Sequence, residues 1–295
     1  MAVPATLITG GLGVGKTTAV LDLLARRPAG ERWAVVVNEA GSVGIDGARL
    51  ATEGVAVREV AGGCVCCVNG PLLRVALVRL LREARPTRLV VEASGLAMPG
   101  PIVDQLREPG LGLEVSATVA LVDPRRLDTL DDVGWAQIDG ADVVVANRCD
   151  QASAGELAAF RARMAEAWPP KRVVAETSFG RLDEAWLSLP PVARDGRIVR
   201  LHPPGHADAV GSYGRTWGPD LVFDDAEVRA AIAALVGTDG VRRVKGALRT
   251  SVGWRQVDGV AGEVTFAPSQ HRADSRLEVL AEADVSAAVA ALRPR

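Results

Sequence analysis

The sequence predicts an α/β protein whose first domain holds a mostly parallel sheet, followed by a smaller α+β domain. Apolar strand candidates in the first part are continuous rather than alternating, which is typical of strands buried on both faces. Helical stretches separate several of these strands, as parallel connections require. The length of 295 residues suits two domains better than one.

Short runs rich in valine and leucine mark the strands of the first domain. They cover Ala5–Thr9, Trp33–Asn38, Val55–Val60, Arg88–Glu92, Val115–Val122, Asp142–Ala146 and Arg172–Ala175. Helices are expected over Thr17–Arg27, Pro71–Ala84 and Ala154–Trp168, the second of which has a proline in its first turn. This alternation predicts a sheet with helices on both faces.

The alternation ends at the segment "SLPPVARDGR", residues 188–197. Beyond it we expect a helix opened by Asp224 and Asp225 and running through Leu235, then antiparallel strands joined by glycine turns. An alanine-rich helix is expected over Asp284–Leu292. The sequence therefore predicts one domain over residues 1–188 and a second over residues 189–295.

Charge and composition exclude several classes of partner. The net charge is −2, the isoelectric point is about 6.0 and only 4% of residues are aromatic, so neither a nucleic acid nor a membrane surface is expected as a partner. The chain begins without a basic, apolar leader, and no run reaches the roughly 18 apolar residues of a membrane span. We expect a cytoplasmic protein with reduced cysteines.

A glycine-rich motif follows the first expected strand. "TLITGGLGVGKTTAVLDLL" contains Gly10-x4-Gly15-Lys16-Thr17, the Walker A pattern, between a strand and a helix. Glycines let successive amides point at phosphate oxygens, Lys16 reaches the β- and γ-phosphates as a catalytic group, and the Thr17 hydroxyl binds Mg²⁺. The expected nucleotide-binding residues of this loop are Gly11, Gly13, Val14, Gly15, Lys16, Thr17 and Thr18.

The segment "VVVANRCD", residues 143–150, indicates the base. Asn147 and Asp150 have the spacing of the guanine-reading N-K-x-D motif of GTPases, at the end of an apolar strand. An aspartate there accepts from guanine N1–H and its amine, and Arg148, in the lysine's place, can lie along the base. The sequence thus favours GTP over ATP.

"RLVVEASGLAMPGP", residues 88–101, brings a carboxylate to the sheet edge where ligands bind in α/β folds. We expect Glu92 to hold the Mg²⁺ shell or orient the attacking water, as a catalytic residue, with Ser94 and Gly95 facing the γ-phosphate. Asn38 and Glu39 follow the second strand in a switch-like loop, where they are candidate nucleotide- or metal-sensing groups.

Three of the four cysteines lie within "GGCVCC", residues 62–67. Three thiolates suit a soft or borderline cation such as Zn²⁺ or Co²⁺, so Cys64, Cys66 and Cys67 are candidate transition-metal ligands. The absence of a second cysteine pair favours an exchangeable site over a closed structural one. A redox pair with C-x-x-C spacing and simple buried thiols remain as alternatives.

The remaining candidates have plainer interpretations. His202 and His206 flank a Pro-Pro-Gly segment and are expected in a solvated linker, with an auxiliary metal site as the alternative. His271 is expected at the surface. Trp217 and Trp254 are expected to pack in the core of the second domain, with a partner surface as the alternative. The sequence leaves the roles of the three histidines open. It also leaves the oligomeric state open, and a homodimer is compatible with it.

The motifs "GGLGVGKTT", "NEAGSVGID", "GGCVCC", "EASGLAMPGP" and "NRCD", in this order, resemble the CobW-like family of P-loop GTPases. The resemblance implies a P-loop NTPase domain, a CobW-type C-terminal domain, and metal-binding thiols at the three clustered cysteines. Ser42, Met98 and Arg148 depart from the family's pattern, which leaves the identity of the metal and the effect of Arg148 on guanine selectivity open.

We therefore expect a GTPase that uses GTP with Mg²⁺, binds zinc or cobalt, and delivers the metal to a client metalloprotein under the control of GTP. A non-enzymatic metal buffer or sensor with a weak nucleotide site is one alternative, and an ATP-dependent P-loop kinase is another. Multiple-turnover hydrolysis that is lost when Lys16 is replaced would exclude the metal buffer or sensor. Competition for the nucleotide site by GDP but not by ADP would exclude the ATP-dependent kinase.

Overall fold

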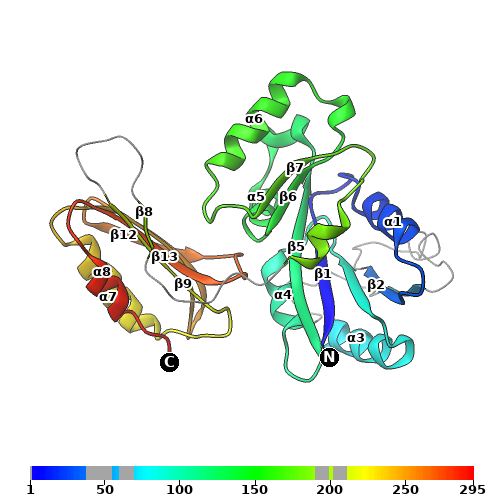
Figure 1. Cartoon of the computed structure of the whole chain (residues 1–295), viewed down its shortest axis with the longest axis horizontal. Coiled ribbons are helices and arrows are strands. Elements are labelled where there is room, and N and C mark those ends of the chain that lie inside the picture. Colours follow the sequence, from blue (N-terminus) through cyan, green and yellow to red (C-terminus); the bar gives the residue numbers. More distant parts are fainter. Residues whose placement is uncertain (1, 38–54, 60–69, 190–198, 202–210) are drawn as a thin grey trace. The chain divides into compact units, whose positions relative to one another are not determined.

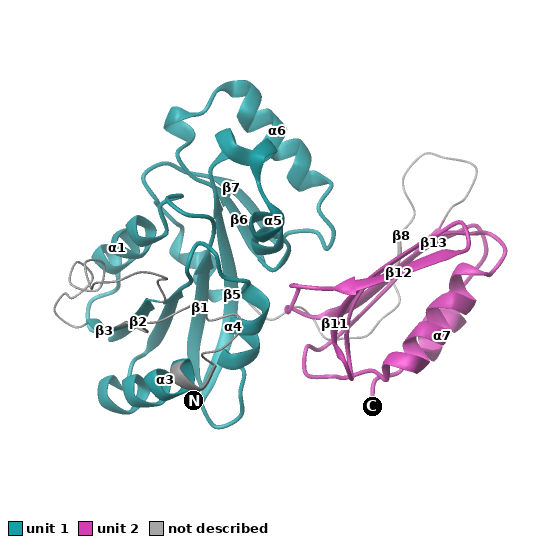
Figure 2. Ribbon diagram, turned by 180° about the vertical axis from the view of Figure 1, so that it is seen from behind, with its two compact units in different colours: residues 1–190 teal, residues 191–295 magenta. Residues whose placement is uncertain are grey.

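The computed structural model describes five segments of the chain, residues 2–37, 55–59, 70–189, 199–201 and 211–295. The chain divides into two compact units, Met1–Pro190 and Pro191–Arg295 (Figure 2). The boundary expected after residue 188 lies two residues from this division. Each unit is built around its own sheet and is described below by itself.

The sheet of the first unit has seven strands, all paired in parallel, in the order β3-β2-β4-β1-β5-β6-β7 (Figure 1). Each strand coincides with one of the runs expected from the sequence, so the prediction of a mostly parallel sheet is confirmed. Their bounds are β1 Val3–Thr9, β2 Trp33–Val37, β3 Val55–Glu59, β4 Arg88–Glu92, β5 Leu113–Val122, β6 Val143–Ala146 and β7 Val173–Glu176.

Helices connect these strands. The three long ones were expected, while α4 and α5, of eight residues each, were not, because two helical turns carry too little periodicity to be recognised. The bounds are α1 Lys16–Arg26, α3 Gly70–Ala84, α4 Pro99–Leu106, α5 Asp132–Asp139 and α6 Ala154–Ala165, with short 3-10 turns η1 Pro124–Thr129, η2 Cys149–Gln151 and η3 Glu184–Ser188.

Successive residues of β1 point to opposite faces of the sheet, which gives the unit three layers. Leu7 is fully buried in a cluster with residues of α3 and α4, such as Leu77 and Ile102. Ile8, equally buried, belongs to a cluster on the other face with residues of α1, such as Leu23. Burial on both faces explains why the strands read as continuous apolar runs.

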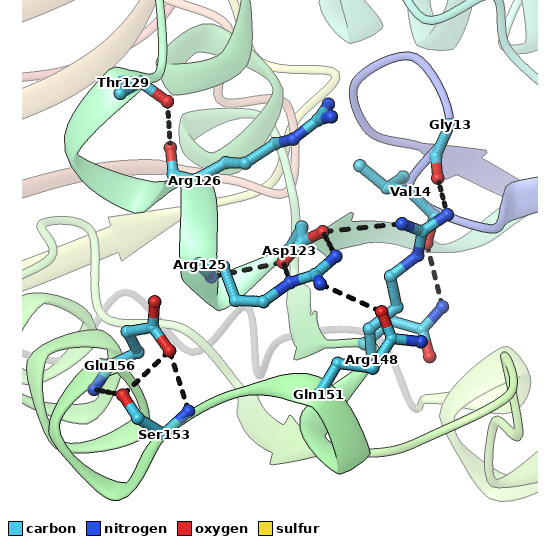
Figure 3. A network of polar contacts seen from close by, with 11 residues as sticks. Gly13, Val14, Asp123, Arg125, Arg126, Thr129, Arg148, Gln151, Ser153 and Glu156 are labelled. Atoms are coloured by element: carbon cyan, nitrogen blue, oxygen red, sulfur yellow. Dashed lines mark hydrogen bonds and ion pairs between the residues drawn. The ribbon is translucent and has the colours of Figure 1, made fainter.

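Helix α6 shows how a local signal sets a helix start. The Ser153 hydroxyl accepts a hydrogen bond from the Glu156 backbone N–H at 3.3 Å, and the Glu156 carboxylate accepts one from the Ser153 N–H at 2.7 Å (Figure 3). This reciprocal arrangement is a capping box, which satisfies amides that have no partner within the helix. It fixes the chain where it leaves the 147–150 segment.

In its described residues, 199–201 and 211–295, the second unit is a six-stranded antiparallel sheet with two helices. Its strand order is β12-β11-β10-β13-β9-β8. Residues of α7 and α8, such as Ile232 and Val289, belong to one hydrophobic core with residues of the sheet. The bounds are β8 Val199–Leu201, β9 Gly211–Trp217, α7 Asp225–Val236, β10 Val241–Thr250, β11 Gly253–Val260, β12 Glu263–Pro268, β13 Ser275–Ala281 and α8 Ser286–Ala291.

Two expectations for single residues of this unit have different outcomes. Trp217 and Trp254 are 4% and 6% exposed, which confirms that they pack in the interior. The expectation that His271 lies at the surface is wrong, because the side chain is 7% exposed and its Nε2 lies 3.1 Å from Asp274 Oδ1. The segment folds back over Trp254, whose carbonyl accepts from the Ser269 N–H. His202 and His206 lie outside the described residues.

Candidate functional site

The predicted site residues of the first unit follow the carboxyl ends of neighbouring parallel strands. The Walker A loop follows β1, Glu92 ends β4, and Asn147 follows β6. Asp123, which was not singled out from the sequence, follows β5. Since the strand order is β4-β1-β5-β6, these residues line one edge of the sheet, the edge at which open α/β sheets bind ligands.

The Walker A loop needs glycine at two points for steric reasons. Gly10 has φ +137°, and a Cβ there would lie 2.3 Å from the Leu121 carbonyl oxygen. Gly15 has φ +100°, and its Cβ would lie 2.6 Å from Asn147 Nδ2. Both positions combine a left-handed backbone with a close neighbour, so any side chain would displace the loop. These close contacts show that the loop packs directly against β5 and against the segment that follows β6.

Lys16 and the start of α1 have the placement that a Walker A motif predicts. The Lys16 side chain is 8% exposed, and its ammonium donates to the carbonyls of Gly10 and Gly11 at 2.8 and 2.9 Å. Val14 is buried, whereas Gly13 and Thr18 are exposed. The loop thereby fixes the position of one positive charge at the N-terminus of a helix, where anions are favoured.

Thr17, in the first turn of α1, contacts Glu92 at the end of β4. The Thr17 hydroxyl donates to Glu92 Oε1 at 2.6 Å, and Glu92 is 6% exposed. A hydroxyl and a carboxylate at this distance form a pair of hard oxygen donors, which is the chemistry that Mg²⁺ prefers. The fold therefore brings together the two residues predicted to hold Mg²⁺, and their oxygen atoms fit this ion. A bound Mg²⁺ would neutralise negative charge on the oxygens of the transferred phosphoryl group.

Asn147 joins two loops through its amide. Its Nδ2 donates to the Val14 carbonyl at 2.8 Å, and its Oδ1 accepts from the Gly180 N–H at 3.0 Å, in a side chain that is 2% exposed. The sequence predicts that Asn147 reads guanine together with Asp150. The structure gives Asn147 a bracing role between loops and leaves Asp150, whose side chain is exposed, as the partner that faces solvent.

Arg148 connects the same segment to the Walker A loop in a second way. Its guanidinium donates to the Gly13 carbonyl and forms an ion pair with Asp123 at 3.8 Å (Figure 3). The buried Asp123 carboxylate also accepts from Arg125 Nε and Nη2 at 2.9 and 2.7 Å. These hydrogen bonds from Arg125 lower the pKa of Asp123, so the carboxylate stays ionised. This Asp123–Arg148 bridge was not expected from the sequence.

The turn after β4 packs directly on the Walker A loop. A Cβ at Gly95 would lie 2.6 Å from the Leu12 side chain and 2.8 Å from its backbone nitrogen. From α5, Gln137 Nε2 donates to the Gly95 and Ala97 carbonyls at 3.0 and 3.2 Å, in a side chain that is 1% exposed. Leu12 and Gly95 border a largely apolar cavity of about 330 Å³ that reaches α5.

Other predicted residues lie outside the described segments or stand alone. Asn38 and Glu39 of the expected switch, and the cysteines 64, 66 and 67, are outside the described residues. The described part of the chain contains no group of three His, Cys, Asp or Glu residues that could hold a metal ion. Cys149 is half-buried against Ala146, whose carbonyl accepts from its thiol at 3.3 Å, and burial raises its pKa. None of the described helices is long and apolar enough to cross a membrane.

Comparison with known proteins identifies the class. Residues 4–175 match the family model described as "CobW/HypB/UreG, nucleotide-binding domain", and the chain belongs to this family. It is 34% identical to the zinc chaperone YeiR of Escherichia coli over 97% of this chain and 96% of the relative. It is 30% identical to the zinc chaperone CobW of Pseudomonas aeruginosa, over 82% of this chain and 76% of the relative.

A solved structure has the same fold. The crystal structure of Zn(II)-bound YjiA GTPase from E. coli matches with a TM-score of 0.51 and 23% identity, over 99% of both chains. This likeness covers both units and supports a P-loop GTPase fold followed by a separate antiparallel domain.

Proposed function

We propose that this protein is a GTP-hydrolysing metallochaperone that binds zinc or cobalt and delivers it to a client metalloprotein. The observation that carries the nucleotide part is the convergence of Lys16, the Thr17–Glu92 pair and the Asn147 brace on one sheet edge. The names of the relatives, zinc chaperones among them, support the metal part.

Each residue of the site has a distinct role in this proposal. Lys16 and the loop amides bind the triphosphate, and Thr17 and Glu92 hold the Mg²⁺ shell. Glu92 also orients the attacking water, while Asp150 accepts from the guanine edge. Hydrolysis at such sites depends on positioning and on compensation of the phosphate charge. Loss of the Lys16 ammonium removes one of the positive charges that provide this compensation.

The cysteines Cys64, Cys66 and Cys67 are proposed as ligands of the transported metal. They lie in the sequence between β3 and α3, and three thiolates suit Zn²⁺ or Co²⁺ better than Mg²⁺. If GTP strengthens metal binding here, the metal must strengthen GTP binding by the same factor. This reciprocity makes the proposed coupling measurable from either side.

The first test is multiple-turnover GTP hydrolysis by the full chain. Wild-type protein should release phosphate from GTP, and Lys16→Ala should lower the rate at least about 100-fold. Protein that binds metal but releases no phosphate would instead be a metal buffer or sensor. Competition by ADP as effective as that by GDP would favour the kinase alternative.

The second test is a titration of Co²⁺ and Zn²⁺ into reduced protein. It is run with a non-hydrolysable GTP analogue, with GDP and without nucleotide, following the thiolate-to-Co²⁺ charge-transfer band. One-to-one binding that strengthens with the triphosphate and is lost in Cys66→Ser supports GTP-controlled delivery. Equal affinity with the analogue and with GDP would refute the coupling.

A further inference from the structure

Phe179 is a solvent-facing aromatic residue in a backbone conformation that aromatic residues avoid. Its side chain is 75% exposed, the highest value among the exposed large hydrophobic residues of the described chain. Its φ is +59°, in the left-handed region, which is unfavourable for a bulky side chain. Both features oppose stability, and strained residues of this kind cluster at functional sites.

The residues on either side of Phe179 hold it in place. The Ser178 hydroxyl accepts from the Asp150 N–H at 3.0 Å, and the Gly180 N–H donates to Asn147 Oδ1 at 3.0 Å. Gly180 also packs against α1, since a Cβ there would lie 2.8 Å from the Ala19 nitrogen. The turn that carries Phe179 is thus bonded to both residues of the predicted base-reading motif.

The topology explains why these two segments meet. Asn147–Asp150 follows β6 and Phe179 follows β7, and these strands are parallel neighbours at the end of the sheet. The Cys149 N–H donates to the Thr177 carbonyl at 3.1 Å, which adds a third bond between the segments. The turn that carries Phe179 therefore lies beside the segment predicted to read the base edge, at the end of the sheet beyond β6.

We propose that the ring of Phe179 covers the nucleobase of the bound nucleotide. This inference rests on the proposed function, which supplies the guanine nucleotide. Aromatic rings stack on every base because each base has a π-face, whereas a carboxylate such as that of Asp150 distinguishes guanine by its donors. Phe179 accordingly contributes affinity for the base, and Asp150 contributes the choice among bases.

The test measures binding of GDP and of inorganic triphosphate to the full chain by calorimetry. Phe179→Ala should weaken GDP binding roughly 5- to 150-fold, the range for loss of one base–aromatic contact, and leave the affinity for inorganic triphosphate within about twofold. Phe179→Tyr should bind GDP like wild type. Val174→Ala removes another exposed apolar side chain, 42% exposed on β7, and serves as the control with unchanged affinity.

A stability measurement separates this role from a structural one. Phe179→Gly removes the ring and relieves the left-handed strain, so the nucleotide-free variant should melt no lower than wild type while it binds GDP more weakly. A lower melting temperature, or an equal loss of GDP and triphosphate, would mean that the ring supports the loop and would overturn the proposal.

The outcomes also distinguish this proposal from the proposed function. Wild-type protein that binds GDP tightly, together with a Phe179→Ala variant of equal affinity, overturns the role of Phe179 alone. The ring would then serve another contact, such as a protein partner. Wild-type protein that binds inorganic triphosphate but gains nothing from the guanosine of GDP overturns both.

Discussion

Replacing Asn147 by alanine should lower the free energy of unfolding of the nucleotide-free protein. The amide makes two buried hydrogen bonds, to the Val14 carbonyl at 2.8 Å and from the Gly180 N–H at 3.0 Å. Alanine leaves both backbone groups unpaired in a site where the side chain is 2% exposed. An unsatisfied buried group costs about 1–3 kcal/mol, so two together predict a loss of about 2–6 kcal/mol.

The assay is urea unfolding followed by far-UV circular dichroism, combined with exchange of the Gly180 amide proton. Protection of that proton should fall in Asn147→Ala, because its acceptor is gone. Asp150→Ala is the matched control: it lies three residues away with an exposed side chain and should change stability by less than about 0.5 kcal/mol while weakening GDP. A loss below about 0.5 kcal/mol in Asn147→Ala would refute the bracing role.

Two further predictions concern other contacts. Burial opposes the charge of Asp274, but hydrogen bonds from His271 and Arg276 outweigh it and lower its pKa from 3.8 to about 2. Because the pKa is lower in the folded than in the unfolded state, the ionised carboxylate stabilises the second unit by about 2 kcal/mol above pH 4, and this contribution is lost as pH falls toward 2. Asp274→Asn should remove this acid dependence from the free energy of unfolding measured against pH. An unchanged pH dependence in the variant would contradict the prediction. Gly95→Ala should lower the rate of GTP hydrolysis more than about 10-fold, because the added Cβ would lie 2.8 Å from the Leu12 nitrogen and displace the Walker A loop. A near-normal rate would show that the loop accommodates the Cβ without losing its catalytic geometry.

Sequence reasoning succeeded where one physical requirement dominates several adjacent residues. Strands such as Val143–Ala146 are buried on both faces, and only a continuous apolar run satisfies that requirement. The Walker A loop is equally recognisable, since Gly10 and Gly15 meet steric limits that no other residue meets. Helices α4 and α5 were missed because short helices depend on their tertiary neighbours.

Contacts that depend on folding were beyond the sequence. Asp123 lies 25 residues before Arg148, and nothing in either segment indicates that the two side chains form an ion pair while Arg148 also donates to the Gly13 carbonyl. His271 was expected at the surface because its neighbours are polar, but those neighbours are the groups that satisfy it in the interior. The segment "ETSFG" after β7 offered one missed signal, an aromatic residue before a glycine at the end of a strand.

The separate hydrophobic cores of the two units have an evolutionary consequence. In the described part of the chain, every core cluster draws its residues from one unit only: three clusters lie in the first unit and one in the second. Substitutions in one core therefore change no packing in the other, and effects of distant, independent sites add. The sequence of the C-terminal unit can therefore diverge while the nucleotide-binding unit keeps its own, and related chains should show coupled changes within each core and none between them.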